Sequence, residues 1–217
     1  TGLGTFAEEL ITTEAAAVKV ERDIPLDVVS LIGCGVTTGV GAAIHTAGVT
    51  PGSSVVVFGC GGVGISAIQG ARIAGASAIL AVDRVEGKLA QARHFGATHV
   101  CTPDAFEAMK TEITAGEGFD YALECIGNPV TIRATWDAAR RGGTAVIVGV
   151  GRADHKVEFN AFELFYSGKT LRGSMYGSAN VRVFMPQLLA LWKAGELDLE
   201  SMITRRIELA EINGAFR

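Results

Sequence analysis

The sequence has few cysteines, few basic residues and no obvious membrane or secretion signal. Its four cysteines form no C-x-x-C pair, which argues against a disulfide framework and a self-contained zinc knuckle. Lys and Arg number 19 against 23 Asp and Glu, so the net charge of -4 offers no basic surface for nucleic acid. We find no uncharged apolar run near the roughly 20 residues of a spanning helix, and no signal peptide. These absences predict a cytoplasmic protein with neither a nucleic-acid nor a membrane partner.

Apolar residues and glycine are both plentiful. Of the 217 residues, 48% are hydrophobic, enough to bury a substantial core. The 28 glycines gather at the ends of apolar runs instead of spreading through a low-complexity tract. This pattern indicates tight turns between strands and helices.

Short β-branched runs alternate with helical patterns through the middle of the chain. Such alternation is typical of a parallel, doubly wound sheet, the α/β Rossmann class. The predicted strands are Ser54–Phe58, Ala78–Val82, Thr98–Cys101, Tyr121–Cys125, Thr144–Val150 and Thr170–Gly173. The predicted helices between them are Gly62–Ala74, Glu86–Phe95, Phe106–Ala115 and Thr131–Ala139. The aromatic segment Phe159–Ser167 is either a subunit contact or ordinary core.

The segments before and after this central region do not show the alternation of strands and helices. Thr5–Ile11 alternates like a half-buried strand, whereas the C-terminal part predicts a helix over Val181–Ala194, a strand over Met202–Leu209 and the beginning of a helix after it. We therefore expect residues 36–175 to form the dinucleotide-binding domain, with residues 1–35 and 176–217 belonging to a second domain. The chain is expected to be a fragment of a longer protein.

A glycine-rich loop follows the first predicted strand and opens a helix. It matches G-x-G-x-x-G through Gly59, Gly61 and Gly64, with Gly62 and Val63 between the last two glycines. The first glycine makes the tight turn, the second lets the backbone approach a pyrophosphate, and the third lets helix and strand pack closely. The helix N-terminus then presents free N–H groups and a positive dipole end to the phosphates.

An acidic residue stands where such a loop needs one. Asp83 ends the second strand, 83 − 64 = 19 positions after the last glycine, and can accept hydrogen bonds from both adenosine ribose hydroxyls. Its charge would repel a 2'-phosphate, which favours NAD over NADP. Arg84 could instead attract that phosphate or lie in solvent, and Lys88 could reach a ribose hydroxyl or point into water.

Several separate motifs resemble the zinc-dependent medium-chain alcohol dehydrogenases. They are the run from Leu31 to Gly41 containing Gly-Cys-Gly, then Pro51-Gly52, the glycine loop and Glu124-Cys-Ile-Gly127. The resemblance covers essentially the whole chain, and it implies that the flanks belong to a GroES-like catalytic domain. It also implies a homodimer or homotetramer.

The resemblance assigns further site residues. In that family the cysteine of the Gly-Cys-Gly turn is a ligand of the catalytic zinc, which places this role on Cys34. From the residues alone, Cys34 is either a small buried cysteine or a thiolate held at a helix N-terminus. A catalytic zinc needs three protein ligands, and the other two lie in a region that this sequence does not contain. The remaining contacts that the resemblance implies are with the nicotinamide, from Thr38, Val63, Val148, Val150 and Tyr176.

Three functions remain open at this point. The first is hydride transfer between NAD and an alcohol, or a thiol–formaldehyde adduct, with zinc as the Lewis acid. The second is a zinc-free quinone or enoyl reductase of the same superfamily. The presence of Cys34, the expected zinc ligand, argues against this alternative. The third is a dinucleotide-binding module without chemistry of its own. No histidine matches a ligand or proton-relay position of the family, and none is assigned a role.

Overall fold

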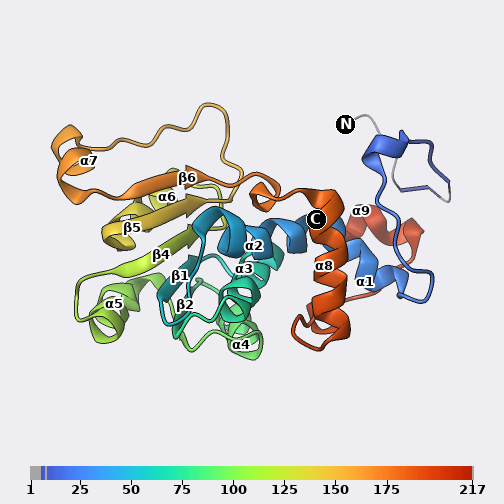
Figure 1. Cartoon of the computed structure of the whole chain (residues 1–217), viewed down its shortest axis with the longest axis horizontal. Helices are drawn as coiled ribbons and strands as arrows, with labels where there is room; N and C mark the ends of the chain where they lie inside the picture. Colours follow the sequence, from blue (N-terminus) through green and yellow to red (C-terminus); the bar gives the residue numbers. More distant parts are fainter. Residues whose placement is uncertain (1–5, 8, 217) are drawn as a thin grey trace.

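A six-stranded parallel sheet forms the centre of the molecule. The computed structural model describes residues 6–7 and 9–216 and gives the strand order β3-β2-β1-β4-β5-β6 (Figure 1). The strands are β1 (Ser54–Phe58), β2 (Ala78–Val82), β3 (His99–Cys101), β4 (Phe119–Glu124), β5 (Ala139–Ile147) and β6 (Thr170–Gly173). This is the doubly wound sheet that the sequence predicts, with the strand order reversing between β1 and β4.

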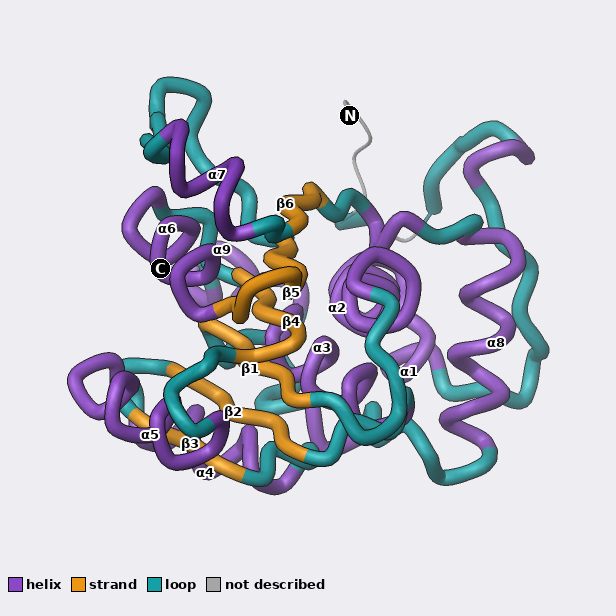
Figure 2. The backbone as a smooth tube through the Cα atoms, turned by 60° about the vertical axis from the view of Figure 1, so that its left-hand side comes forward, coloured by secondary structure: helices purple, strands orange, loops and turns teal. Residues whose placement is uncertain are grey.

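Helices cover both faces of this sheet. They are α3 (Gly62–Ile73), α4 (Glu86–His94), α5 (Phe106–Thr114), α6 (Pro129–Ala138) and α7 (Ala161–Ser167), with the short turn η4 (Pro103–Ala105) before α5. Figure 2 shows α3 on one side of the strands and α5 and α6 on the other. Strands β1 and β2 are therefore buried on both faces, which explains their continuous apolar residues, whereas the edge strand β6 is largely exposed.

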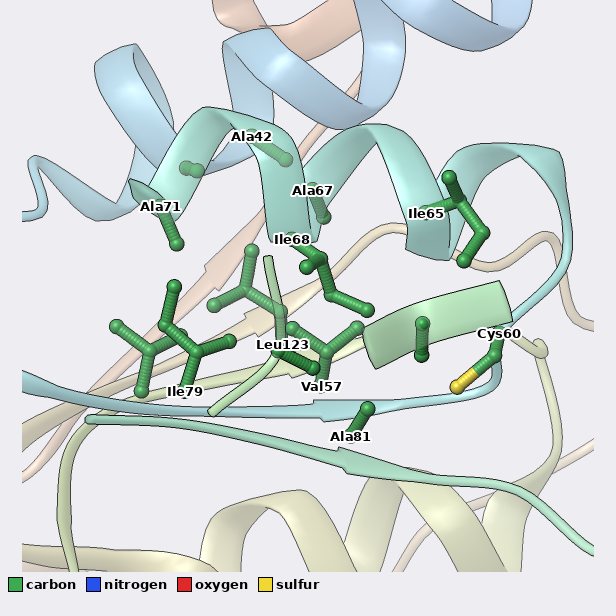
Figure 3. Close-up of a cluster of buried hydrophobic side chains, with 14 of the residues drawn as sticks. Ala42, Val57, Cys60, Ile65, Ala67, Ile68, Ala71, Ile79, Ala81 and Leu123 are labelled. Atoms are coloured by element: carbon green, nitrogen blue, oxygen red, sulfur yellow. The ribbon is translucent and has the colours of Figure 1, made fainter. Parts of the chain in front are cut away.

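Successive residues of β1 supply two separate cores. Val55 and Val57 point into the core shared with α3 and α4, whereas Val56 and Phe58 point into the core shared with α5. Figure 3 shows Val57 and Leu123 of the sheet facing Ile68 of α3. All of these side chains are at most 5% exposed, and each fully buried one stabilises the fold by roughly 1.5–3 kcal/mol.

A third core lies in the flanking helices. The helical stretch Leu26–Ala47 consists of four consecutive elements that pack beside α8 (Val181–Lys193) through Val28, Ile32 and Leu188. Those four elements are α1 (Leu26–Leu31), η2 (Ile32–Val36), α2 (Thr37–Gly41) and η3 (Ala42–Ala47). The remaining short elements are η1 (Glu14–Ala16), η5 (Tyr176–Ser178), η6 (Glu200–Met202), η7 (Leu209–Glu211) and α9 (Ile212–Ala215).

The stretch Leu26–Ala47 corrects one expectation from the sequence. It is long enough to cross a membrane by length and composition alone, with a mean hydropathy of 1.6 over its most apolar window. Glycines and threonines interrupt its apolar residues, so no continuous apolar run marks this stretch in the sequence. Half of that window is buried inside the protein, against α3 and α8, as in the core helix of a folded domain.

Both strands predicted in the flanks are wrong. The described residues of Thr5–Ile11 form no strand, and Thr5 and Glu8 lie outside the described residues. Met202–Leu209 is irregular between η6 and η7. An alternating pattern becomes a strand only beside a partner strand, and in the described residues neither segment has one. The helix predicted after Leu209 is confirmed as α9.

The expected domain boundary at residues 35 and 36 falls inside the stretch Leu26–Ala47, which continues from the flank into the central domain. Elsewhere the predicted ends shift by small amounts. Strand β5 begins at Ala139 instead of Thr144 and ends at Ile147 instead of Val150.

Candidate functional site

The glycine loop joins β1 to α3 at the carboxyl edge of the sheet. Gly59 has a φ of +91°, a backbone conformation that favours glycine. A Cβ on Gly64 would overlap the carbonyl oxygen of Gly59, so no larger residue lets α3 start this close to the turn. The two glycines thus have the turning and packing roles that the motif predicts.

Gly61 and Gly62 leave open space above the loop, in contrast to Gly59, which makes the turn, and Gly64, which permits close packing. Both are exposed, and a Cβ at either would meet nothing within 4 Å. Gly61 is the N-cap of α3, and no side chain hydrogen-bonds there as a cap. The free space above these residues is therefore the approach that a pyrophosphate needs to reach the helix N-terminus. Val63, half-buried in the first turn of α3, lies beside it.

Asp83 lies directly beside the loop. Its Oδ2 accepts a hydrogen bond from the backbone N–H of Cys60 at 2.8 Å, and its Oδ1 accepts one from Val85 at 3.0 Å. The carboxylate is thereby fixed at the end of β2 while remaining partly exposed. Burial, and then the nearby charge of Asp83, raise the pKa of the Cys60 thiol to about 12. The loop therefore carries a neutral thiol, which does not repel phosphate.

A pocket of about 600 Å³ opens next to Asp83. Its walls include Arg84 and Lys88 on one side and Ile126 and Thr131 on the other. A carboxylate in a largely apolar pocket suits an adenosine, whose base has flat aromatic faces and whose ribose offers hydroxyl donors. Lys88 is exposed and also borders a second pocket, of about 230 Å³, against Gly61 and Gly62. It can therefore reach either the ribose or the phosphates.

Two of the residues expected near the nicotinamide, Thr38 and Val63, lie on the neighbouring helices α2 and α3. Thr38 is half-buried on α2, where the neighbouring Gly39 lies so close to α3 that a Cβ would overlap the carbonyl oxygen of Val63. The turn η5 packs on the same helix, since a Cβ on Gly41 would lie 2.8 Å from Gly177 Cα. The close approach of Gly39 to Val63 thus places Thr38 on a helix that packs directly against the first turn of α3, a contact that no local sequence pattern indicates.

Cys34 lies within a helix and not in a turn. It belongs to η2, a π-helical segment in the middle of the stretch Leu26–Ala47, so the expectation of a thiolate at a helix N-terminus is wrong. The alternative of a buried cysteine is wrong as well, because Cys34 is exposed. The hydroxyl of Tyr176 donates a hydrogen bond to the carbonyl oxygen of the adjacent Gly33 at 3.0 Å. Burial, and then the Cys34 sulfur, raise the pKa of Tyr176.

The described residues do not form a complete metal site around Cys34. Within residues 6–7 and 9–216, no group of three His, Cys, Asp or Glu side chains could hold a metal ion. A catalytic zinc needs three protein ligands and one open position, so the described residues do not fit a complete zinc site. They do fit a site to which Cys34, exposed on the surface, supplies one ligand.

The last two predicted contacts follow β5. Val148 is 7% exposed and its N–H donates to the carbonyl oxygen of Glu124 at 2.8 Å, whereas Val150 is 93% exposed. Both lie beyond the end of β5 at the carboxyl edge, on the far side of β4 from Asp83. The arrangement therefore runs along one edge of the sheet, from Asp83 through the glycine loop to Val148, as dinucleotide sites in such sheets do.

Comparisons with known proteins identify the family of the chain. The family described as zinc-binding dehydrogenase matches residues 62–193. The S-(hydroxymethyl)glutathione dehydrogenase of Paracoccus denitrificans is 37% identical over 224 residues, which cover 99% of this chain and 60% of that protein. An alcohol dehydrogenase class-3 of Cereibacter sphaeroides is 36% identical over 225 residues, with the same two shares. The chain thus spans about three fifths of the length of these relatives.

A solved structure shows the same fold. The benzyl alcohol dehydrogenase of Acinetobacter calcoaceticus superposes with a TM-score of 0.87 at 37% identity, over 92% of this chain and 55% of that one. The family match extends over more than half of the chain, from the glycine loop to the end of α8. The chain belongs to the zinc-binding dehydrogenase family.

Proposed function

We propose that this chain is the dinucleotide-binding part of an NAD-dependent alcohol dehydrogenase. The observation that supports this most strongly is the hydrogen bond from Cys60 N–H to Asp83, because it joins the phosphate-binding loop and the ribose-binding acid into one site. Asp83 would accept hydrogen bonds from the adenosine ribose, and the N-terminus of α3 would face the pyrophosphate. Thr38, Val63, Val148, Val150 and Tyr176 would surround the nicotinamide.

The chemistry proposed for the whole enzyme is hydride transfer between the nicotinamide and an alcohol or a thiol–formaldehyde adduct. The adduct is included because one relative is named an S-(hydroxymethyl)glutathione dehydrogenase. Cys34 would supply one ligand of a zinc ion, which as a Lewis acid lowers the pKa of a bound alcohol. The other ligands would come from outside the described residues.

A paired titration with NADH and NADPH tests the cofactor proposal. Wild-type protein, shown to be folded by circular dichroism, should bind NADH clearly more tightly than NADPH. Asp83→Asn should weaken NADH binding roughly 10- to 100-fold, since hydrogen bonds to charged groups contribute about 1.5–3 kcal/mol. Asp104→Asn removes the same charge after the neighbouring strand β3 and should leave NADH binding unchanged. A folded wild-type protein that binds neither nucleotide would contradict the proposal.

The zinc ligand needs a test in the complete enzyme. Cys34→Ser should lower both the zinc content, measured by elemental analysis, and the activity. Cys101→Ala is the control, because Cys101 is buried at the end of β3 and far from Cys34 in the fold. A wild-type enzyme that is active without zinc would instead support the zinc-free reductase.

We also propose that two copies of the chain associate through β6 and α7. Strand β6 is an edge of the sheet, and an unpaired edge favours pairing with another strand. Beside it, Phe162, Phe165 and Met175 are 67%, 81% and 85% exposed, so the alternative of ordinary core is wrong for the first two. Sedimentation should show a dimer or tetramer for the wild type and a monomer for Phe165→Asp. A wild-type monomer would contradict this. The cytoplasmic location stays a prediction.

A further inference from the structure

We infer that Glu124 is a positioning residue that holds both ends of the dinucleotide site in register, an inference that depends on the proposed function. Glu124 is the last residue of β4, the strand next to β1. Its side chain is fully buried, with 0% exposed. Burial of a carboxylate raises the free energy of the folded state unless hydrogen bonds compensate for the lost hydration. The hydrogen-bond partners of Glu124 therefore indicate which segments it positions.

The carboxylate binds the loop between β4 and α6. Gly127 N–H donates to both carboxylate oxygens, at 2.9 and 3.0 Å, and Ile126 N–H donates to Oε1 at 3.1 Å. The Thr131 hydroxyl, in the first turn of α6, donates to Oε1 at 2.6 Å. Four hydrogen bonds to one buried side chain, from three residues of the loop and helix α6, therefore fix the position of the loop.

The loop in turn borders the adenosine half of the site. Ile126 and Thr131 line the pocket that contains Asp83. Ile126 also presses against the glycine turn, since a Cβ on Gly59 would lie 2.6 Å from Ile126 Cγ1. A shift of the loop would therefore move one wall of the pocket and crowd the turn that leads to the pyrophosphate.

The backbone of Glu124 holds the nicotinamide half. Its carbonyl oxygen accepts hydrogen bonds from Val148 N–H at 2.8 Å and from Gly149 N–H at 3.0 Å. The same segment packs on the loop, because a Cβ on Gly127 would overlap the carbonyl of Val150. One residue thus connects the wall of the adenosine pocket to the segment expected beside the nicotinamide.

The contacts fit a carboxylate better than an amide, because Oε1 accepts three of the four hydrogen bonds and Oε2 accepts the fourth, from Gly127 N–H. Every group that contacts the Glu124 side chain donates a hydrogen bond to it, and the N–H of Gly127 approaches both of its oxygens. In Glu124→Gln one of those oxygens becomes an NH2 group, which would place a donor against the N–H of Gly127. The variant keeps the shape of the side chain and removes only its ability to accept at both positions.

The matched control lies at the other end of the same strand. Asp120 accepts hydrogen bonds from Ser54 N–H at 2.8 Å and from its hydroxyl at 2.9 Å, at the amino edge of the sheet. Asp120→Asn therefore also replaces a carboxylate that holds a backbone N–H, but it does so away from the dinucleotide site. Thr131→Val removes a single donor to Glu124 and serves as a milder second variant.

Two readouts test the inference: the Kd for NADH, and amide hydrogen exchange in the cofactor-free protein. We expect Glu124→Gln to weaken NADH binding about tenfold and to accelerate exchange at Ile126 and Gly127 about tenfold relative to the rest of the sheet. Thr131→Val should also weaken NADH binding and accelerate exchange at Ile126 and Gly127, by a smaller factor. If Glu124→Gln does not fold, the result for Thr131→Val tests the inference. Asp120→Asn should leave both within twofold.

Failure of this inference and failure of the proposed function have different signatures. Wild-type protein that binds no NADH contradicts the proposed function. Unchanged NADH binding, or unchanged exchange at Ile126 and Gly127, in Glu124→Gln overturns the role of Glu124 even when the wild type binds well. A uniform rise in exchange across the whole sheet also overturns it, because it would mean a loss of global stability and not of loop position.

Discussion

The inner strands of the sheet and the two ends of the flanking segments differ in where their apolar side chains lie. In the sheet, Val55 and Val56 are completely buried on opposite faces. In the flanks, Phe6, Ile11 and Phe216 are 61%, 96% and 75% exposed. The inner strands are therefore covered by helices of the same chain, whereas these three side chains near the ends of the flanks stay largely exposed. An apolar pattern therefore predicts a strand or a helix only where the same chain supplies a surface for it to pack against.

The largest expected effect tests whether the flanks contain any core of their own. Leu188 of α8 is fully buried against the stretch Leu26–Ala47, and Leu188→Ala should lower the free energy of unfolding by about 2–5 kcal/mol. Leu209→Ala is the control, because Leu209 is 55% exposed and should change stability by less than about 0.5 kcal/mol. Urea unfolding measures both. Equal losses in the two variants would break the distinction between the helical layer and the remaining flank.

A smaller effect separates packing from ligand contact within the glycine loop. Gly64→Ala should destabilise the protein by about 1–3 kcal/mol, because the added Cβ overlaps Gly59. Gly61→Ala meets nothing within 4 Å, so thermal unfolding should stay nearly unchanged while NADH binding weakens at least tenfold. If Gly61→Ala bound NADH normally, the open space above the loop would not be the path of the pyrophosphate.

The smallest effect concerns the amino edge of the sheet and depends on pH. Burial raises the pKa of Asp120, but hydrogen bonds from Ser54 and Arg140 outweigh it and hold the pKa below the usual 3.8. A lowered pKa means that this stabilisation is present above pH 3.8 and is lost as the pH falls through the folded value. Asp120→Asn should therefore cost about 1 kcal/mol at pH 7 and progressively less below pH 3.8, as measured by urea unfolding at several pH values. If the difference in unfolding free energy between the wild type and Asp120→Asn were the same at every pH, the charge of Asp120 would play no part in the stabilisation.

The sequence predicts the central domain well because local signals and tertiary partners agree there. Strands β2 and β6 have the predicted bounds, and α3 ends one residue earlier than expected. The beginning of β5 could not be predicted, because Arg140 to Gly143 has no apolar pattern and is a strand only through its neighbour β4, across a register shift.

The candidate site divides in the same way. A spacing rule finds Gly59 and Asp83, because the chemistry of the ligand fixes both the residues and their separation. No local pattern finds the contact between Gly41 and Gly177, which are far apart in the sequence and touch only after α2 and η5 pack. The helical state of Cys34 was missed because glycines on both sides indicate a turn, and tertiary packing overrides that propensity.

The stretch Leu26–Ala47 also has a consequence for biosynthesis. Its partner α8 begins at residue 181, roughly 140 residues after Val40. At about 5–20 residues per second, a ribosome needs roughly 7–30 s to deliver that partner. Throughout this interval the nascent chain displays the face of Val28 and Ile32 that α8 later covers. Translation speed between residues 40 and 181 thus sets how long the most apolar segment stays open to chaperones and to aggregation.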